Sequence, residues 1–172
     1  MSVKQILTEP NKLLRQISRP VENVGDKERA LMDDMLDTMY AAPGIGLAAI
    51  QIGVPKRIIV IDISRDENKK EPMYFVNPVI KNKNKDKSKY EEGCLSVPDQ
   101  FAEIERPNKC EVEYLDYNGK KKILKADGLL ATCIQHEMDH LEGILFIDYL
   151  SKLKKSMIIK KLSKIKSKRI IV

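Results

Sequence analysis

The sequence predicts an α+β fold, with mostly antiparallel sheets packed around one central helix and a further helix at the C-terminus. The predicted strands and helices follow one another without a regular βαβ alternation or an internal repeat. An Asn-Gly dipeptide joins two of the strands, which is a strong signal for an antiparallel hairpin. One helix after the strands is apolar over much of its circumference, so we expect it at the centre of the fold.

The first predicted elements are one helix and two strands. Residues 57–63 and 73–80 are rich in β-branched side chains and predict strands, and Pro78 places the second at a sheet edge or a strand end. The Lys-rich segment 81–89 is expected to be an exposed loop or a hairpin tip. The helix covers residues 27–41 and stops at Pro43-Gly44; its apolar face consists of Leu31, Met35, Leu36 and Met39.

Two more strands and the central helix follow. Residues 111–115 and 121–125 flank Asn118-Gly119 and predict the hairpin. The central helix is predicted to run for about four turns, from an N-cap at Asp127 to a stop at Gly143.

Length and composition are those of one ordinary globular domain. The 172 residues contain three cysteines, which are too few and odd in number for a disulfide framework. No apolar run approaches the roughly 20 residues of a membrane span, and no apolar segment of a secretory signal follows the first basic residue. We therefore expect a cytoplasmic, monomeric protein without a membrane segment.

The positive charge is concentrated at the C-terminus. The net charge is +6, but residues 151–172 carry nine positive charges and no acid, which leaves the first 150 residues at −3. We expect a catalytic domain over residues 1–150 and a basic helical extension over 151–172, where any polyanionic partner would bind. Apolar residues at helical spacing predict one docked face of that helix: Leu150, Leu153, Met157, Ile158, Leu162 and Ile165.

The central helix carries the only two histidines of the chain. His136 and His140 are four residues apart, so both imidazoles project from one face, and Glu137 reaches the edge of that face. Two neutral imidazoles hold a divalent metal, and a nearby carboxylate takes a proton from its water. Two incidental histidines on a polar edge are the alternative. The sequence therefore predicts a metal-binding central helix of a metallohydrolase.

A catalytic site of this kind needs a third protein ligand. Glu142 falls on a different face of the helix, and Asp148 follows the apolar stretch 144–147. Cys94 is the better candidate because Gly93 permits a close backbone approach and Pro98 ends the segment rigidly. Taken alone, Cys94 would more often be a buried, inert thiol.

The segment Gly44–Ala49 also fits the dinucleotide-binding pattern G-x-G-x-x-A. That pattern must follow a strand and open a helix, whereas this segment follows a helix and precedes a strand. A tight backbone wall beside the metal site is the better interpretation.

Three short motifs in a fixed order resemble those of the peptide deformylase family, of the bacterial type with a basic C-terminal helix. The resemblance extends from the N-terminal segment to Leu150, and its motifs are Gly44–Gln51, Glu92–Ser96 and Gln135–His140. It implies hydrolytic removal of the formyl group from N-formylmethionyl nascent peptides, with release of formate.

The resemblance also implies residue roles. Cys94, His136 and His140 would be the metal ligands, and Glu137 would be the acid and base. Gln51 and the backbone N–H of Leu95 would bind the formyl oxygen.

Further residues are predicted to surround this site. Ile45, Gly46, Gly93 and Cys133 are expected at the substrate, with Ile45 and Cys133 lining a pocket for the methionine side chain. Plain core packing is an equal alternative for Cys133. A buried charge network of Glu92, Arg106 and Asp139 would support the ligands, unless Arg106 lies on the surface. Phe101 stands where many relatives carry Arg.

The metal and the partner remain open at this point. A Cys/His/His set suits Fe²⁺, Zn²⁺, Ni²⁺ or Co²⁺, and the resemblance favours Fe²⁺. It also implies docking on the ribosome through the basic C-terminal helix, as in some deformylases. The alternatives are another metallohydrolase, such as a peptidase, and an inactive ribosome-binding module with a structural metal.

Overall fold

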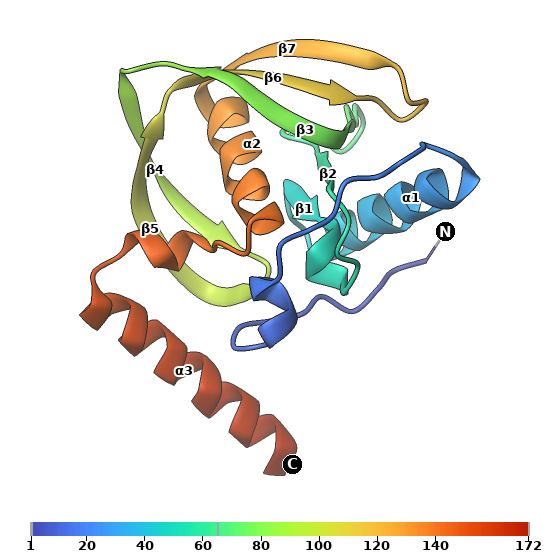
Figure 1. Cartoon of the computed structure of the whole chain (residues 1–172). Helices are drawn as coiled ribbons and strands as arrows, with labels where there is room; N and C mark the ends of the chain where they lie inside the picture. Colours follow the sequence, from blue (N-terminus) through green and yellow to red (C-terminus); the bar gives the residue numbers. More distant parts are fainter. Residues whose placement is uncertain (1, 65, 172) are drawn as a thin grey trace.

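Two antiparallel sheets enclose helix α2 (Figure 1) in the structure, a computed structural model. It describes residues 2–64 and 66–171, with side chains as far as Ile165. The larger sheet has the strand order β1-β2-β3-β6-β7, and β4 and β5 form the second sheet. The predicted α+β class is confirmed.

The elements have the following bounds. The helices are α1 (Asp26–Ala41), α2 (Gly128–Leu141) and α3 (Lys152–Ile171), with 3₁₀ turns η1 (Lys12–Arg15), η2 (Ala49–Ile52) and η3 (Phe146–Tyr149). The strands are β1 (Gly46–Ala48), β2 (Ile58–Ile61), β3 (Met73–Lys83), β4 (Lys87–Cys94), β5 (Val97–Pro107), β6 (Lys109–Leu115) and β7 (Lys121–Asp127).

The prediction for Pro78 was wrong for a strand end, but it holds locally for an edge, because β3 has no β2 partner beyond Val76. Strand β3 continues to Lys83 and lies inside the sheet, between β2 and β6. The pairing with β2 ends at Val76, and the β6 register shifts between Val76 and Val79. Pro78 therefore falls within a bulge, where its missing N–H costs no regular ladder hydrogen bond.

The Lys-rich segment 81–89 is exposed as predicted, but it is neither a loop nor a hairpin tip. Strand β3 extends to Lys83 and β4 starts at Lys87, so only residues 84–86 connect them. Because β4 pairs with β5, the chain turns a corner here from one sheet into the other (Figure 1).

The predicted β6–β7 hairpin and the limits of α2 are confirmed. Asp127 occupies the N-cap position, although its side chain makes no capping hydrogen bond. Gly143, with a φ of 73°, follows the helix end, and a Cβ there would overlap the backbone carbonyl of Arg15. Only glycine fits this close contact.

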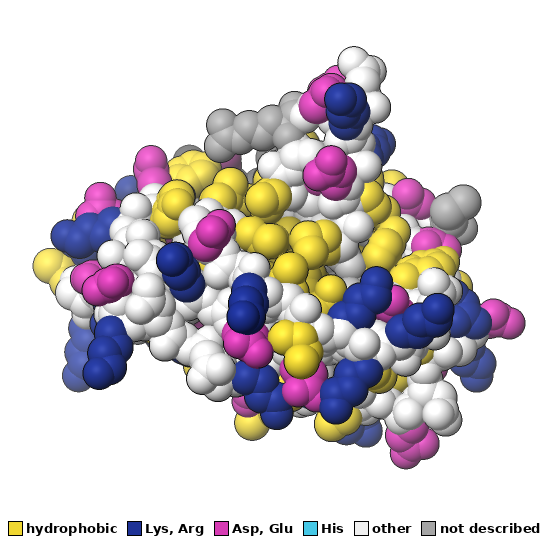
Figure 2. Space-filling model, turned by 90° about the horizontal axis from the view of Figure 1, so that it is seen from above, with side chains coloured by type: hydrophobic (Ala, Val, Ile, Leu, Met, Phe, Trp, Pro, Cys, Tyr) yellow, Lys and Arg dark blue, Asp and Glu magenta, His cyan; other side chains and the backbone are white. Residues whose placement is uncertain are grey.

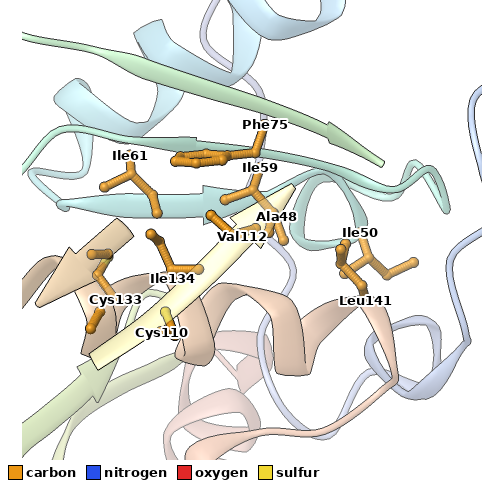
Figure 3. Packing of buried hydrophobic residues seen from close by; sticks show 12 residues of the cluster. Ala48, Ile50, Ile59, Ile61, Phe75, Cys110, Val112, Cys133, Ile134 and Leu141 are labelled. Atoms are coloured by element: carbon orange, nitrogen blue, oxygen red, sulfur yellow. The ribbon is translucent and has the colours of Figure 1, made fainter. Parts of the chain in front are cut away.

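Helix α2 has two buried faces: one packs on the larger sheet, and the other carries the two histidines. Ala131, Ile134, Met138 and Leu141, at helical spacing, pack on the larger sheet in a cluster that includes Ile59, Ile61, Phe75 and Val112 (Figure 3). Burying each large side chain stabilises the fold by roughly 1.5–3 kcal/mol. This packing fixes the rotation of α2, so that residues 133, 136, 137 and 140 form the second face.

Helix α3 docks on the body through part of its apolar surface. Ile158 and Leu162 are buried against a cluster that includes Val97 and Phe146. Leu153, Met157 and Ile165 are 71%, 51% and 38% exposed, so the prediction of one docked face was wrong for these three residues. The helix lies below β5 (Figure 1), and among its described side chains Ile158, Ile159 and Leu162 join this cluster. The side chains of Lys166, Lys168 and Arg169 lie outside the described residues.

Figure 2 shows one face of the molecule, on which hydrophobic side chains gather around the centre and charged side chains surround them. No histidine is visible on this face, in keeping with the burial of His136 and His140. Within residues 2–64 and 66–171, no helix has the length and apolarity needed to cross a membrane.

Candidate metal centre

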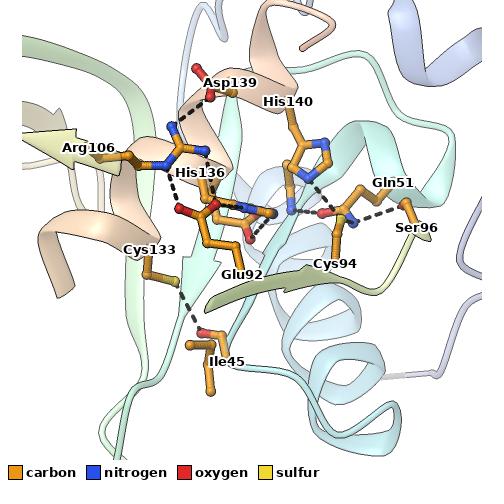
Figure 4. Close-up of polar contacts among 12 residues, drawn as sticks. Ile45, Gln51, Glu92, Cys94, Ser96, Arg106, Cys133, His136, Asp139 and His140 are labelled. Carbon is orange, nitrogen blue, oxygen red and sulfur yellow. Dashed lines mark hydrogen bonds and ion pairs between the residues drawn. The ribbon is translucent and has the colours of Figure 1, made fainter. Parts of the chain in front are cut away.

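Three donor side chains converge between α2 and the end of β4 (Figure 4). The ligand atoms of Cys94, His136 and His140 all lie within 4.8 Å of one another, and Cys94 Sγ is 3.4 Å from His140 Nε2. Bonds of about 2.0–2.3 Å around a tetrahedral ion separate two ligands by roughly 3.5 Å. One thiolate and two imidazoles at this spacing fit a divalent transition metal.

The downstream alternatives for the third ligand lie elsewhere. Glu142 forms an ion pair with Arg57, with an N–O distance of 2.9 Å. Asp148 pairs with Arg15 at 2.6 Å. The fold thus brings Cys94, and neither of these acids, to the two histidines.

A buried charge network holds His136, as predicted. Glu92 Oε1 lies 2.9 Å from His136 Nδ1, and a proton on Nδ1 leaves Nε2 free to bind a metal. Arg106 donates to both carboxylate oxygens of Glu92, at 2.7 and 3.0 Å, and to Asp139 Oδ2 at 2.9 Å. Arg106 is only 5% exposed, so the alternative of a surface position was wrong.

The electrostatics of this network favour positive charge at the histidine. Burial opposes ionisation of Glu92, yet hydrogen bonds from His136 and Arg106 keep its pKa below the ordinary value. Burial also disfavours a charged His136, but Cys94 and Glu92 outweigh it and raise its pKa. Burial and the neighbouring His136 lower the pKa of His140 well below its ordinary value, which favours the neutral imidazole that binds a metal.

Glu137 lies beside the three donor atoms without belonging to them. Its Oε1 is 3.9 Å from His136 Nε2, and its buried Oε2 has no hydrogen-bond partner among the described residues. Burial raises the pKa of Glu137 to about 7. A buried carboxylate oxygen without a partner is costly, and perturbed acids of this kind are typical of functional sites.

Gln51 presents its amide N–H₂ to the same site. Its Oε1 accepts a hydrogen bond from the Ala48 N–H at 2.9 Å, which orients the amide. Its Nε2 donates to Ser96 Oγ at 3.0 Å and lies 3.6 Å from Cys94 Sγ. The side chain is therefore held as a neutral donor next to a candidate metal ligand.

A cavity of about 590 Å³ opens beside the metal-ligand cluster. All four predicted substrate residues line it, together with Gln51, Leu95, His136 and Glu137: Ile45, Gly46, Gly93 and Cys133. Cys133 also belongs to the hydrophobic core, which confirms core packing, and its place in a methionine pocket stays a prediction. Phe101 lies at the cavity, 66% exposed, with its ring so close to Gly93 that a Cβ there would be 2.6 Å away.

Sequence reasoning missed several residues of this cavity. Leu129 and Thr132 are one turn before Cys133 and His136, so their helical spacing could have placed them there. Ser96 ends the second motif and is fully buried against Gln51. Tyr90 is two residues before Glu92 in β4, so the two side chains lie on the same face of the strand. No sequence signal distinguished Tyr90 from a surface tyrosine.

Comparison with known proteins agrees with this geometry. The family model of polypeptide deformylase matches residues 3–156. A peptide deformylase of Pelagibacter ubique (strain HTCC1062) is 91% identical over 172 residues, which are 100% of both chains. The crystal structure of the Ehrlichia chaffeensis enzyme superposes with a TM-score of 0.91 at 45% identity, covering 96% of this chain and 97% of that one.

A second Ehrlichia chaffeensis peptide deformylase structure, in complex with actinonin, has a TM-score of 0.90 at 48% identity and covers 95% of this chain and 98% of that one. These matches extend over nearly the whole chain and include each of the three motifs. The chain belongs to the polypeptide deformylase family.

Proposed function

We propose that Cys94, His136 and His140 hold the metal with which this enzyme removes the formyl group from formylmethionyl N-termini. The family membership establishes a metal-dependent hydrolase that releases formate from new polypeptides. The residue roles are supported above all by the convergence of three donor atoms within 4.8 Å, beside a carboxylate oxygen that has no partner among the described residues.

Glu137 moves the proton in this proposal. A divalent ion in the site supplies a water of lowered pKa and polarises the formyl carbonyl. Glu137 Oε2 accepts the proton of the attacking water and returns it to the departing amine. Its burial favours the second step, because a carboxyl group with a pKa near 7 is a competent acid at neutral pH.

Gln51 and the backbone N–H of Leu95 stabilise the oxyanion that develops on the formyl oxygen. The Gln51 amide is anchored at its oxygen by Ala48, and its nitrogen lies between Ser96 Oγ and Cys94 Sγ, beside the site where the formyl oxygen would bind. One such donor in a preorganised site contributes about 2.7–4 kcal/mol to transition-state stabilisation. A neutral amide achieves this without competing for the metal.

The methionine side chain occupies the cavity between Ile45 and Cys133, with Gly46 and Gly93 allowing the peptide to approach the backbone. Ile45 is 42% exposed at the cavity, so a bound side chain would cover it. Phe101 offers an apolar surface to the following residues of the peptide, where an Arg would offer charge.

We assign Fe²⁺ as the working metal, with Zn²⁺, Ni²⁺ or Co²⁺ as substitutes, because a Cys/His/His set accepts all four. Anaerobic purification, metal analysis and a formate-release assay on formyl-Met peptides test both the metal and the reaction. We expect iron and rapid release of formate, with loss of activity in air. If no formate is released with any of the four metals, the proposal is contradicted.

Gly46→Ala tests the placement of Glu137. A Cβ at Gly46 would lie 2.7 Å from Glu137 Oε1 and 3.0 Å from Cys133 Sγ, so the carboxylate must shift. A displacement of about 1 Å in a catalytic group costs on the order of 10²-fold in rate, and we expect such a loss in kcat. Gly25→Ala is the control, since nothing lies within 4 Å of its Cβ. If the two variants have equal kcat values, the close contact at Gly46 does not determine the catalytic position of Glu137.

We further propose that the enzyme is a cytoplasmic monomer, with residues 1–150 as its catalytic domain and 151–172 as an extension that binds the ribosome. Five exposed lysines of α3 support this contact: Lys152, Lys154, Lys160, Lys161 and Lys164.

Changing these five lysines to Gln should weaken cosedimentation with ribosomes and reduce its salt dependence. The matched control changes the five exposed lysines of segment 81–89 to Gln. Equal losses in both variants would show only non-specific attraction to RNA, and no loss in the α3 variant would reject the contact.

A further inference from the structure

Tyr149, the last residue of η3, touches two members of the charge network that holds His136. Its hydroxyl donates to Asp139 Oδ2 at 2.8 Å, and its ring centroid is 4.9 Å from Arg106 Cζ. The residue is 53% exposed and does not line the cavity. Tyr149 therefore contacts the charge network and is not part of the cavity lining.

An unbroken series of hydrogen bonds links Tyr149 to the metal-ligand cluster. Asp139 Oδ2 accepts hydrogen bonds from both Tyr149 and Arg106, and Arg106 holds both oxygens of Glu92. Glu92 in turn holds His136 Nδ1. Figure 4 shows the inner part of this series of hydrogen bonds, from Asp139 through Arg106 and Glu92 to His136.

The outer end of such a network is its weakest part, because water competes there for the charged groups. The side chain of Asp139 is 19% exposed, whereas those of Arg106 and Glu92 are each 5% exposed. The Tyr149 hydroxyl donates a hydrogen bond to the same Asp139 oxygen that accepts from Arg106, and the Tyr149 ring lies against the Arg106 guanidinium. Cation–π contacts and charge-assisted hydrogen bonds gain strength when water is excluded.

We propose that Tyr149 is a positioning residue of the metal site, which locks Asp139 and Arg106 so that Glu92 keeps His136 oriented for the metal. The inference rests on the proposed ligand set of Cys94, His136 and His140. Losing an outer partner of a metal ligand commonly costs 10- to 100-fold in metal affinity. Because the Tyr149 hydroxyl acts through three side chains, Asp139, Arg106 and Glu92, we expect the lower end, about tenfold faster loss of the metal.

The test follows metal dissociation into a chelator, together with kcat, KM and the unfolding temperature, for Tyr149→Phe. This change removes one hydroxyl from a half-exposed side chain and leaves the ring over Arg106. The matched control is Tyr117→Phe, because the Tyr117 hydroxyl also binds a carboxylate, that of Asp33, at 3.1 Å. We expect faster metal loss in Tyr149→Phe alone, with KM unchanged.

A double variant separates positioning from a general loss of stability. If Tyr149 acts through Asp139, then Tyr149→Phe should have no further effect on metal loss in the Asp139→Asn background. Additive effects of the two changes, or parental metal loss in Tyr149→Phe, would overturn the proposal. Equal metal loss in Tyr117→Phe would overturn it as well.

The same assay distinguishes a failure of this inference from a failure of the ligand set. His140→Ala should lose the metal far faster than any Tyr149 variant, because it removes a donor atom. If His140→Ala keeps the metal, the ligand set is wrong and the role of Tyr149 is wrong with it. If only Tyr149→Phe keeps the metal, the ligand set stands and the positioning role is rejected.

Discussion

Replacing Glu137 with alanine is expected to lower kcat about a thousandfold while the metal content stays that of the parent enzyme. The carboxylate is buried and lies outside the group of three donor atoms, so its removal would delete the proposed proton carrier without deleting a proposed ligand. General acid–base catalysis contributes about 10²- to 10⁴-fold, and here one group serves in both directions. Formate release and metal analysis on the same preparation measure the two effects.

The control for this variant is Glu91→Ala. Glu91 lines the same cavity, but it is exposed on β4 and should leave kcat and metal content unchanged. Glu137→Gln keeps the shape of the side chain and excludes collapse of the buried site as the cause. Near-normal turnover in Glu137→Gln would remove Glu137 from proton transfer, and metal loss in Glu137→Ala would instead suggest a ligand or structural role.

Much of the candidate site could be predicted because its chemistry depends on local spacing. His136, Glu137 and His140 share one helix face by their positions alone, and α2 begins and ends where Asp127 and Gly143 predict. Cys94 is 42 residues before His136 in the sequence, and its place in a glycine-flanked motif made it a candidate. Its distance to the histidines depends on how β4 packs against α2, which only the fold determines.

The parts that the sequence could not predict depend on tertiary contacts. Pro78 is locally at an edge, because β2 ends at Ile58 opposite Val76, and a bulge opposite β6 accommodates it within a strand that continues to Lys83. Leu153 and Met157 fit a docked helix face by spacing, yet the body covers only the side of α3 that carries Ile158 and Leu162. Tyr149 has no motif or periodicity, since its role arises from contacts with two distant elements.

Several features of the site also explain one another physically. Gly46 lets β1 approach α2 so closely that Glu137 and Cys133 fill the space of a missing Cβ. This approach contributes to the burial of Glu137, and burial is the largest of the causes that raise its pKa to about 7. The glycine-rich segment, which resembled a nucleotide-binding loop by pattern, thus forms a wall against the buried Glu137 carboxylate.

Replacing Cys94 with alanine is expected to remove the metal and, with it, the activity. Two imidazoles alone leave a transition metal with fewer than the three protein ligands of a catalytic site. Because loss of an outer partner already costs up to about 100-fold in metal affinity, loss of a donor atom should cost more than that. Dialysis against a chelator, metal analysis and formate release measure the effect.

The chain offers a matched control in Cys133→Ala. Cys133 lies on the same face of α2 as the histidines and lines the same cavity, but it is outside the group of donor atoms. This variant should keep the metal and change only KM for formyl-Met peptides, because a thiol in the proposed methionine pocket is lost. Cys94→Asp should recover part of the metal binding, since a carboxylate supplies an anionic ligand. If Cys94→Ala retains the metal and Cys133→Ala loses it, the third ligand has been assigned to the wrong cysteine.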